Sequence, residues 1–238
     1  VDRVRRRAKW ILVELSGGVV LAVHLRMTGQ ILVVSCDAPL DPYVRARLAL
    51  DDGRELRFRD VRAFGRLALV ARRDDGLPAR TLDPSSQPLL AEQGDEPLEA
   101  SFTVGRLHAL LAPKRGRIKP LLLDQRIVAG LGNIYVCEAL FRSGISPRRV
   151  AATVKGTRAA RLVPEIKATL AEAIAAGGSS LRDYVQPDGE LGYFQHAWKV
   201  YGREGEPCPD CPGGPACDGV RRIVQSGRST FYCPRSQR

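Results

Sequence analysis

The amino-acid sequence predicts an α+β protein in which an antiparallel β-sandwich or barrel precedes a helical segment and a cysteine-bearing β-hairpin segment. Three observations support this order. Short, partly alternating apolar runs separated by glycine turns fill residues 1–75, apolar residues take up a helical spacing from Ser101, and short β segments return from Tyr193. We therefore expect three parts, at residues 1–98, 99–192 and 193–238.

The first part is predicted to contain short antiparallel strands joined by tight turns. Gly17-Gly18 and Asp52-Gly53 are dipeptides typical of two-residue hairpin loops. The apolar runs around them predict strands at residues 11–15, 19–25, 30–34 and 66–71 and a hairpin over residues 45–58. Residues 75–98 are rich in Pro, Asp, Gln and Ser, which indicates a connecting loop.

The middle part is predicted to be helical. Residues 103–112 and 158–176 place apolar residues at helical spacing, and Gly177-Gly178 supplies a C-terminal stop for the second of these helices. Between them, residues 114–142 open with four cations in six residues, pass two glycines and restart as a helix at Asn133. The simplest interpretation of this stretch is two helices joined by a glycine turn.

The same stretch also has the features of an anion site. Turn amides, the start of a helix and nearby cations together attract anions, because unpaired N–H groups and the helix dipole point at the ligand. A glycine turn of this kind is nevertheless common without a ligand. Residues 114–142 therefore predict either a phosphate site or an ordinary turn.

The chain is strongly basic, with a formal net charge of +11 and a pI of about 9.8. Lys and Arg side chains that neutralise phosphates release condensed counterions, so this charge indicates a polyanionic partner. The excess of arginine suits bidentate phosphate contacts, although a GC-rich genome would produce the same bias. No apolar run is long enough to cross a bilayer, and no signal peptide is evident at the N-terminus. We expect a cytoplasmic, nucleoid-associated protein with no membrane partner.

Four of the six cysteines crowd near the C-terminus, at Cys208, Cys211, Cys217 and Cys233. A Cys-x-x-Cys pair with further cysteines in a reducing compartment predicts one structural zinc ion, bound by thiolates in a closed tetrahedron. The alternatives are a three-cysteine site without Cys217 or no metal at all. Cys36 and Cys137 lie in apolar surroundings, which predicts buried, inert thiols.

Several motifs occur in order along nearly the whole chain. They are RRRAKWILVEL at 5–15, HLRMTG at 24–29, DVRAFGR at 60–66, IKPLLLDQRIVAGLGNIYVCEALF at 118–141, GGSSLRDYVQPDGELGYF at 177–194, VYGREGEPC at 200–208 and GRSTFYC at 227–233. Together they resemble the formamidopyrimidine-DNA glycosylase and endonuclease VIII family, with the formamidopyrimidine branch favoured. The resemblance implies a helix–two-turn–helix DNA-binding domain in the middle part and a zinc-finger hairpin in the last part.

The resemblance implies a base-excision repair enzyme, a bifunctional DNA glycosylase and apurinic-site lyase. Its expected partner is damaged double-stranded DNA with oxidised purines such as 8-oxoguanine and formamidopyrimidine, and we expect a monomer. Members of the family attack the sugar C1′ with the α-amine of an N-terminal proline, beside a glutamate that acts as general acid.

This sequence begins at Val1 without a Pro-Glu start, so we expect that the catalytic front end is missing from it. The alternative function is a catalytically inactive protein that binds damaged DNA or abasic sites. An RNA-binding zinc protein is disfavoured, because nothing in the sequence resembles an aromatic base-stacking sheet.

Three residues of the first part resemble the family's gap-filling side chains. A base pulled from the stack leaves a hole that apolar or planar groups must fill. By resemblance, Met27 and Phe64 form this wedge and Arg62 reads the orphaned partner base. Taken singly, each residue would be assigned a structural role, as core filler or as a strand-end cation.

Three further residues of the first part are expected near the DNA by resemblance. Lys9 matches an active-site lysine that contacts phosphate near the lesion and assists the elimination chemistry. His24 and Tyr43 are candidates for contacts to the DNA backbone. For His24, packing in the core or in a turn is an equal alternative, and Tyr43 stands where the family often has a histidine.

The resemblance also assigns roles in the middle and last parts. The expected phosphate ligands around the helix–two-turn–helix are Lys114, Lys119, Asn133 and Tyr201. Arg228 matches the active-site arginine of the finger, which enters the minor groove and grips the lesion's phosphates. Glu138 is expected to brace the Asn133 turn, and residues 179–193 are expected to form a loop that closes over the everted base.

In the family, two Cys-x-x-Cys pairs flank the hairpin of the zinc finger. Here the second pair reads CPRS, so Ser236 stands where the fourth ligand belongs, and serine is a poor zinc ligand. Cys217 lies in an unusual insert, PGGPACDG. We expect Cys217 to supply the missing thiolate.

Overall fold

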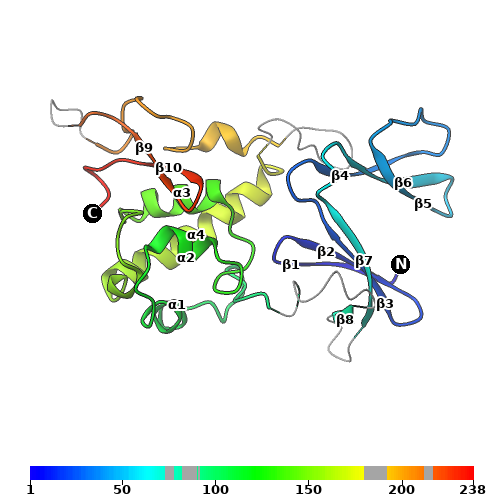
Figure 1. Ribbon diagram of the computed structural model, residues 1–238, viewed down its shortest axis with the longest axis horizontal. Helices are drawn as coiled ribbons and strands as arrows, with labels where there is room; N and C mark the ends of the chain where they lie inside the picture. The colour runs from blue at the N-terminus through cyan, green and yellow to red at the C-terminus, as the bar shows by residue number, and fades with distance from the viewer. Residues whose placement is uncertain (73–77, 82–89, 91, 180–191, 212–216) are drawn as a thin grey trace. The chain divides into compact units, whose positions relative to one another are not determined.

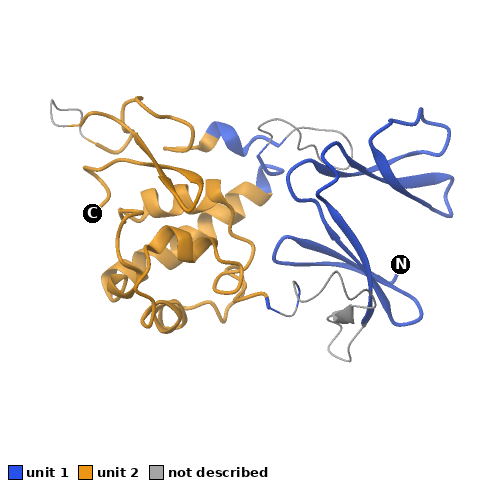
Figure 2. Ribbon diagram, in the orientation of Figure 1, with its two compact units in different colours: residues 1–92, 175–196 blue, residues 93–174, 197–238 orange. Residues whose placement is uncertain are grey.

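The computed structural model describes residues 1–72, 78–81, 90, 92–179, 192–211 and 217–238. The chain forms two compact units (Figures 1 and 2), unit 1 with residues 1–92 and 175–196 and unit 2 with residues 93–174 and 197–238. The predicted α+β class is confirmed, since strands dominate unit 1 and helices with one hairpin make up unit 2. None of the described helices has the length and apolar content needed to cross a membrane.

Unit 1 contains two antiparallel sheets. The larger has the order β1-β2-β3-β7-β8, with β1 at Arg3–Arg7, β2 at Trp10–Leu15, β3 at Val19–His24, β7 at Arg66–Arg72 and β8 at Pro78–Thr81. The smaller has the order β4-β6-β5, with β4 at Gly29–Ser35, β6 at Arg54–Asp60 and β5 at Val44–Ala49.

Two of these strands are not predicted by the sequence. β1 reads RVRRR, which has no apolar alternation, yet each of its residues pairs with β2. Arg5 of β1 forms an ion pair with Glu14 of β2 at 2.5 Å, so a carboxylate on β2 favours a basic neighbouring strand. β8 lies inside the stretch predicted to be a loop and pairs with β7.

The two sheets share an apolar core. Leu21 and Val23 of β3 cluster with Phe58 of β6, and the side chains packed around them come from both sheets. The opposite face of the larger sheet buries a second cluster: Trp10, Leu12, Val20, Ala22 and Val70. Both faces of β2 therefore carry apolar residues, which is typical of a strand that is covered on both sides.

Unit 2 is built from helices and one hairpin. The helices are α1 at Val104–Leu111, α2 at Ile118–Leu123, α3 at Asn133–Arg142 and α4 at Thr157–Ala175, with a 3-10 turn, η2, at Ala151–Thr153, and the hairpin strands are β9 at Arg221–Gln225 and β10 at Arg228–Tyr232. Buried aliphatic side chains from all four α-helices form one core. A second cluster contains Phe141 of α3 and Phe231 of β10, and it packs the hairpin onto α3.

One glutamine holds the turn between α2 and α3. Gln125 Nε2 donates to the carbonyls of Leu123 and Leu131 at 2.9 and 3.0 Å, and its Oε1 accepts from the Gly130 N–H at 2.9 Å. Gly130 has a φ of +82°, in the left-handed region that favours glycine. The turn therefore fixes where α3, and with it Asn133, begins.

Candidate nucleic-acid interface and metal centre

The β3–β4 loop (residues 25–28) and the β6–β7 loop (residues 61–65) leave unit 1 side by side. The last residue of β3 pairs with the first residue of β7, and the first residue of β4 pairs with the last residue of β6. Both loops therefore connect the same two pairs of strands at the same end. These two loops, which we call the loop pair, carry Met27, Arg62 and Phe64.

The loop pair presents two large apolar side chains to solvent. Met27 is 69% exposed and Phe64 is 61% exposed, and Arg62 is exposed as well. Burying such side chains in the core would stabilise the fold, so adjacent exposed apolar groups indicate a binding surface. The structure places the three residues together at the surface, rather than in the core where single-residue assignments would put Met27 and Phe64.

Lys9 and Tyr43 lie at the same end of unit 1. Lys9 is exposed in the two-residue turn between β1 and β2. Tyr43 directly precedes β5 and is 40% exposed, and its carbonyl accepts from the N–H of the last residue of β6 at 2.9 Å. The Arg59 guanidinium lies over the Tyr43 ring, 5.4 Å from its centroid. The Tyr43 ring is therefore held in place by a cation–π contact.

His24 is a hydrogen-bond acceptor at the base of the β3–β4 loop. Its Nδ1 accepts from the Arg26 N–H at 3.0 Å, and its ring meets Trp10 edge-on with centroids 5.0 Å apart. Burial, followed by the charges of Arg26, Lys9 and Arg66, lowers the pKa of His24 to about 4. The imidazole is therefore neutral at pH 7, and it could contact a phosphate only as a neutral hydrogen-bond donor.

In unit 2, Lys119 lies at the centre of a buried junction between α2, α3 and β10. Its side chain is fully buried, and Nζ donates to Asn133 Oδ1 at 2.6 Å, to the Ser229 carbonyl at 3.1 Å and to Thr230 Oγ1 at 2.7 Å. These bonds use all three donors of the ammonium group. The structure thus places Lys119 where it ties the hairpin to α3, and a direct phosphate contact would require one of these bonds to break.

Asn133 extends this junction to Tyr201. The Asn133 Nδ2 donates to the Ser229 carbonyl at 2.9 Å and to the Tyr201 hydroxyl at 3.3 Å. The Tyr201 ring packs edge-on against Phe231, with centroids 5.0 Å apart, and against Trp198, with centroids 5.1 Å apart. Two of the predicted phosphate ligands, Asn133 and Tyr201, are therefore in direct contact.

Arg228 is exposed beside this junction, at the start of β10 and directly after the β9–β10 turn. Burial lowers the pKa of Lys119, and the charge of Arg228 lowers it further, although Cys137 acts in the opposite direction. Lys119 Nζ is bonded to the carbonyl of Ser229, the residue that follows Arg228, so the buried cation lies close to the base of the exposed one.

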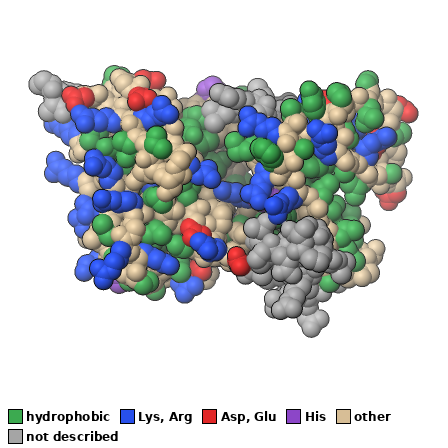
Figure 3. All heavy atoms as spheres, viewed as in Figure 1, with side chains coloured by type: hydrophobic (Ala, Val, Ile, Leu, Met, Phe, Trp, Pro, Cys, Tyr) green, Lys and Arg blue, Asp and Glu red, His purple; other side chains and the backbone are tan. Residues whose placement is uncertain are grey.

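Lys114 is exposed on the segment between α1 and α2, together with Arg115 and Arg117. Its carbonyl accepts from the Ala152 N–H at 3.2 Å, which ties the segment to η2. Over the helices of unit 2, Figure 3 shows many Lys and Arg side chains and few acidic ones. This surface has the charge that a phosphate backbone requires.

Three cysteines form a cluster whose Sγ atoms all lie within 4.8 Å of one another: Cys208, Cys211 and Cys233. The Sγ atoms of Cys211 and Cys217 lie 3.4 and 3.7 Å from that of Cys233. Tetrahedral zinc thiolates with bonds of about 2.3 Å place sulfur atoms about 3.8 Å apart. The cluster therefore has the spacing of a structural zinc site, and Cys217 lies beside it.

One thiol of the cluster, that of Cys233, is surrounded by hydrogen-bond donors that favour its ionised form. Burial opposes ionisation of Cys233, but hydrogen bonds from the Ser236 side chain and from the N–H groups of Ser236 and Arg235 lower its pKa to about 6. Burial raises the pKa of Cys211 among the neighbouring thiols. Ser236 Oγ lies 3.8 Å from Cys208 Sγ. The hydroxyl therefore borders the cluster, whereas Cys217 offers the softer ligand.

Two expectations about single residues are wrong. The carboxylate of Glu138 does not brace the Asn133 turn: it is fully buried and accepts from the N–H groups of residues 199–201 at 2.8, 3.0 and 2.8 Å. The reason is that Glu138 lies on the side of α3 that faces this segment. Cys137 is buried as predicted, but Cys36 is exposed, because it lies in the turn that follows β4.

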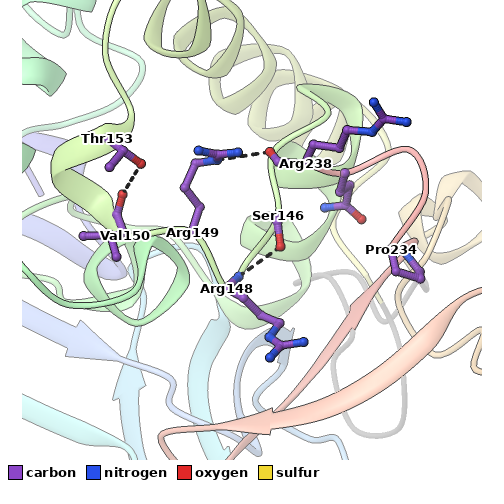
Figure 4. A pocket seen from close by; sticks show the side chains of 8 residues that line it. Ser146, Arg148, Arg149, Val150, Thr153, Pro234 and Arg238 are labelled. Atoms are coloured by element: carbon purple, nitrogen blue, oxygen red, sulfur yellow. Dashed lines mark hydrogen bonds between the residues drawn. The ribbon is translucent and has the colours of Figure 1, made fainter.

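A pocket of about 550 Å³ lies between the segment that follows α3 and the last residues of the chain (Figure 4). Arg148, Arg149 and Arg238 line it, but their guanidinium groups point in different directions. Arg149 Nε donates to the Arg238 carbonyl at 3.1 Å. Because the cations do not converge, we assign this pocket no ligand.

Residues 180–191, most of the predicted closing loop, lie outside the described residues. The flanking residues Ser179 and Tyr193 form an antiparallel bridge, and Tyr193 is 58% exposed. Two buried polar residues at the base of the loop pair, Thr28 and Asp60, were not predicted as functional from the sequence. Their positions in the sequence could have identified them, because each is a polar residue at a strand end, directly beside a residue predicted to contact DNA.

Comparison with known proteins agrees with this arrangement. The sequence profile of the formamidopyrimidine-DNA glycosylase N-terminal domain matches residues 1–67, and the profile of the formamidopyrimidine-DNA glycosylase H2TH domain matches residues 93–185. The formamidopyrimidine-DNA glycosylases of Acidiphilium cryptum and Rhodospirillum centenum are 52% and 54% identical to the chain. These matches cover 100% and 98% of this chain and 82% and 81% of those proteins.

Solved structures show the same family similarity. The crystal structure of MutM (Fpg) from Thermus thermophilus is 44% identical, with a TM-score of 0.84 over 98% of this chain and 81% of that one. The Lactococcus lactis Fpg in complex with DNA that contains an abasic site is 31% identical, with a TM-score of 0.83 over 99% of this chain and 81% of that one. With this similarity along its whole length, the chain belongs to the formamidopyrimidine-DNA glycosylase family.

Proposed function

We propose that this chain recognises damaged sites in duplex DNA as a base-excision repair DNA glycosylase and apurinic-site lyase for oxidised purines. The observation that carries the proposal is the exposure of Met27 and Phe64 beside Arg62 on the loop pair. A base that leaves the stack creates a gap that apolar or planar side chains must fill. Two exposed apolar side chains with a planar cation beside them suit this gap.

In this proposal the residues of unit 1 act on the lesion and its partner base. Met27 and Phe64 enter the stack, and the Arg62 guanidinium donates hydrogen bonds to the orphaned base. Lys9 contacts a phosphate near the lesion and assists the elimination steps. His24 and Tyr43 contribute neutral hydrogen bonds to the DNA backbone.

The residues of unit 2 hold the phosphates. Arg228 supplies a planar cation that binds phosphate oxygens in a bidentate manner, and Lys114 adds a second charge. Asn133 and Tyr201 provide neutral donors next to them. Lys119 holds Asn133 and β10 in place through its hydrogen bonds to Asn133, Ser229 and Thr230.

Oxidised purines are supported as substrates by solved relatives. Lactococcus lactis Fpg has been crystallised with DNA that contains Fapy-dG, and MutM with DNA that contains carbocyclic 8-oxo-G. In the family, the α-amine of an N-terminal proline attacks the sugar C1′, and the adduct is a Schiff base. With chromosomal DNA as its substrate, the protein would work in the cytoplasm with the nucleoid.

Binding and trapping experiments test the proposal. Duplexes with an abasic site or 8-oxoguanine should bind at least about tenfold more tightly than intact duplex, because the first already lacks a base and the second carries the base that the protein is proposed to evert. Borohydride added to the complex should trap a covalent adduct if the chain also carries out catalysis. Tight binding to an abasic site without a covalent adduct would mean that the chain binds damaged DNA but does not catalyse the reaction. Equal affinity for damaged and intact duplex would overturn the proposal.

We also infer that Cys208, Cys211, Cys217 and Cys233 hold one zinc ion that stabilises the finger hairpin. The support is the mutual spacing of the thiols of Cys208, Cys211 and Cys233, the position of Cys217 Sγ 3.7 Å from Cys233 Sγ, and the presence of the weaker ligand Ser236 at the family position. Metal analysis of the purified protein should give one zinc per chain. Cys217→Ser should weaken zinc retention against a chelator, whereas Ser236→Ala and the control Cys36→Ser should not. Full retention in Cys217→Ser would exclude Cys217 as a ligand.

A further inference from the structure

Asp60 is a fully buried carboxylate between the two loops of the loop pair. Its Oδ1 accepts from the Thr28 hydroxyl, and its Oδ2 accepts from the Gly65 N–H at 2.7 Å. Thr28 Oγ1 in turn accepts from the Arg62 N–H at 3.2 Å. One carboxylate and one hydroxyl therefore link the end of the β3–β4 loop to both ends of the β6–β7 loop.

This link is charged although it is buried. Burial opposes ionisation of Asp60, but hydrogen bonds from Thr28 and from the N–H groups of Gly65, Arg62 and Ala63 outweigh burial and lower its pKa. Hydrogen bonds to an ionised acceptor are roughly twice as strong as neutral ones. The contacts that join the two loops are therefore of the stronger kind.

The backbone of both loops is held in conformations that need such support. Arg26 has a φ of +56° and Ala63 a φ of +54°, in the left-handed region that residues with a Cβ rarely adopt. A Cβ at Gly65 would collide with Phe58 Cζ and lie 3.0 Å from Asp60 Oδ2, so only glycine permits this approach to Asp60. Such backbone persists only where its surroundings determine it.

We infer that Asp60 and Thr28 are positioning residues that hold the side chains of the loop pair as one preorganised wedge, and that this wedge sets the preference for duplex with a missing base. The inference rests on the proposed function. Intact duplex has no gap, so a rigid wedge makes full contact only where a base has left the stack. If the loops moved independently, they would have to be ordered on binding, and the preference would fall.

Three substitutions test this inference. Thr28→Val keeps the shape of the side chain but removes the hydroxyl, Asp60→Asn removes the charge, and Thr28→Ser keeps the hydroxyl. The measurement is the ratio of affinities for an abasic-site duplex and an intact duplex of the same sequence. Thr28→Val, which removes the hydrogen bonds to Asp60 and from Arg62, should lower this ratio about tenfold, and so should Asp60→Asn. Thr28→Ser should leave the ratio unchanged.

A stability control separates positioning from general destabilisation. Val70→Ala removes a fully buried side chain from the other core cluster of unit 1, so it should lower the melting temperature without changing the ratio. An unchanged ratio in Thr28→Val and Asp60→Asn would overturn the inference while the proposed function stands. Absence of any preference in the unsubstituted protein would instead overturn the proposed function.

Amide hydrogen exchange gives a second measurement, made on the unsubstituted protein. It tests whether Asp60 and Thr28 hold the two loops even if the variants do not fold. The Arg62 and Gly65 N–H groups lie in a surface loop but donate to buried acceptors. They should therefore exchange as slowly as the amides of β6. Exchange at the rate of an unprotected loop would overturn the inference.

Discussion

Each unit uses a buried charged group to support exposed side chains of a different kind. In unit 1, the buried carboxylate of Asp60 accepts hydrogen bonds from loops that expose the apolar Met27 and Phe64. In unit 2, the buried ammonium of Lys119 donates to the hairpin that exposes the basic Arg228. Apolar groups fill a gap in the base stack, whereas cations bind phosphate. Substitutions in unit 1 should therefore change the preference for damaged DNA, and substitutions in unit 2 should change the salt dependence of binding.

The largest effect is expected at the buried cation of unit 2. Lys119→Met removes the ammonium, which leaves the acceptors on Asn133 and Thr230 without this donor and the Ser229 carbonyl with only the bond from Asn133 Nδ2. We expect unfolding free energy to fall by about 2–4 kcal/mol in denaturant titrations. Lys114→Met is the control, because Lys114 is exposed and its loss should leave stability nearly unchanged. Equal stability of the two variants would contradict the role of Lys119 in the junction.

The next effect concerns the phosphate contact. Arg228→Ala should weaken binding to lesion DNA by about 2 kcal/mol, and the slope of log affinity against log salt should fall by about 0.9, as expected for one lost phosphate contact. The matched control is Arg221→Ala on the same hairpin, because Arg221 is already paired with Asp218. A slope that does not change in Arg228→Ala would argue against a phosphate contact.

A smaller effect, without a change in the salt dependence, is expected in unit 1. Phe64→Ala should weaken binding to abasic-site duplex by about 1.5 kcal/mol through lost stacking, with no change in the salt slope. A 2-aminopurine beside the lesion should show less unstacking on binding. Leu69→Ala, which removes an exposed apolar side chain from the middle of β7, is the control. If both variants behaved alike, Phe64 would have no special role.

The smallest effect is a pH dependence at the base of the β3–β4 loop. The pKa of His24 is about 4 in the folded protein and about 6.5 in the unfolded chain. The unfolded state therefore binds a proton that the folded state does not bind between these values, and stability falls as the pH drops from 6.5 towards 4. After allowance for solvent screening, we expect on the order of 1 kcal/mol.

His24→Asn tests this pH dependence, because it keeps an acceptor near the Arg26 N–H and removes the titrating group. The variant should show a flatter profile of unfolding free energy between pH 6.5 and 4 than the unsubstituted protein. Identical profiles would mean that another group causes the loss of stability in this range.

Much of the fold was predictable because its signals are local. Gly17-Gly18 and Asp52-Gly53 mark hairpin turns, and the stop of α4 before Gly177 follows from the left-handed backbone that glycine adopts there. β1 could not be predicted, since its run of arginines becomes a strand only through pairing with β2 and through the carboxylate of Glu14. The exposure of Cys36 likewise depends on where β4 ends, which no local pattern shows.

By itself, the sequence determined the family and the order of the β, helical and cysteine-bearing parts, because motifs and periodicity can be read along the chain. It also predicted which residues contact DNA. Only the tertiary structure decided how those residues act. It buried Lys119 and saturated its donors, directed Glu138 to residues 199–201, and joined the two loops through Asp60 and Thr28. The physical reason is that burial and hydrogen-bond partners arise from residues far apart in the chain, so they exist only once the chain has folded.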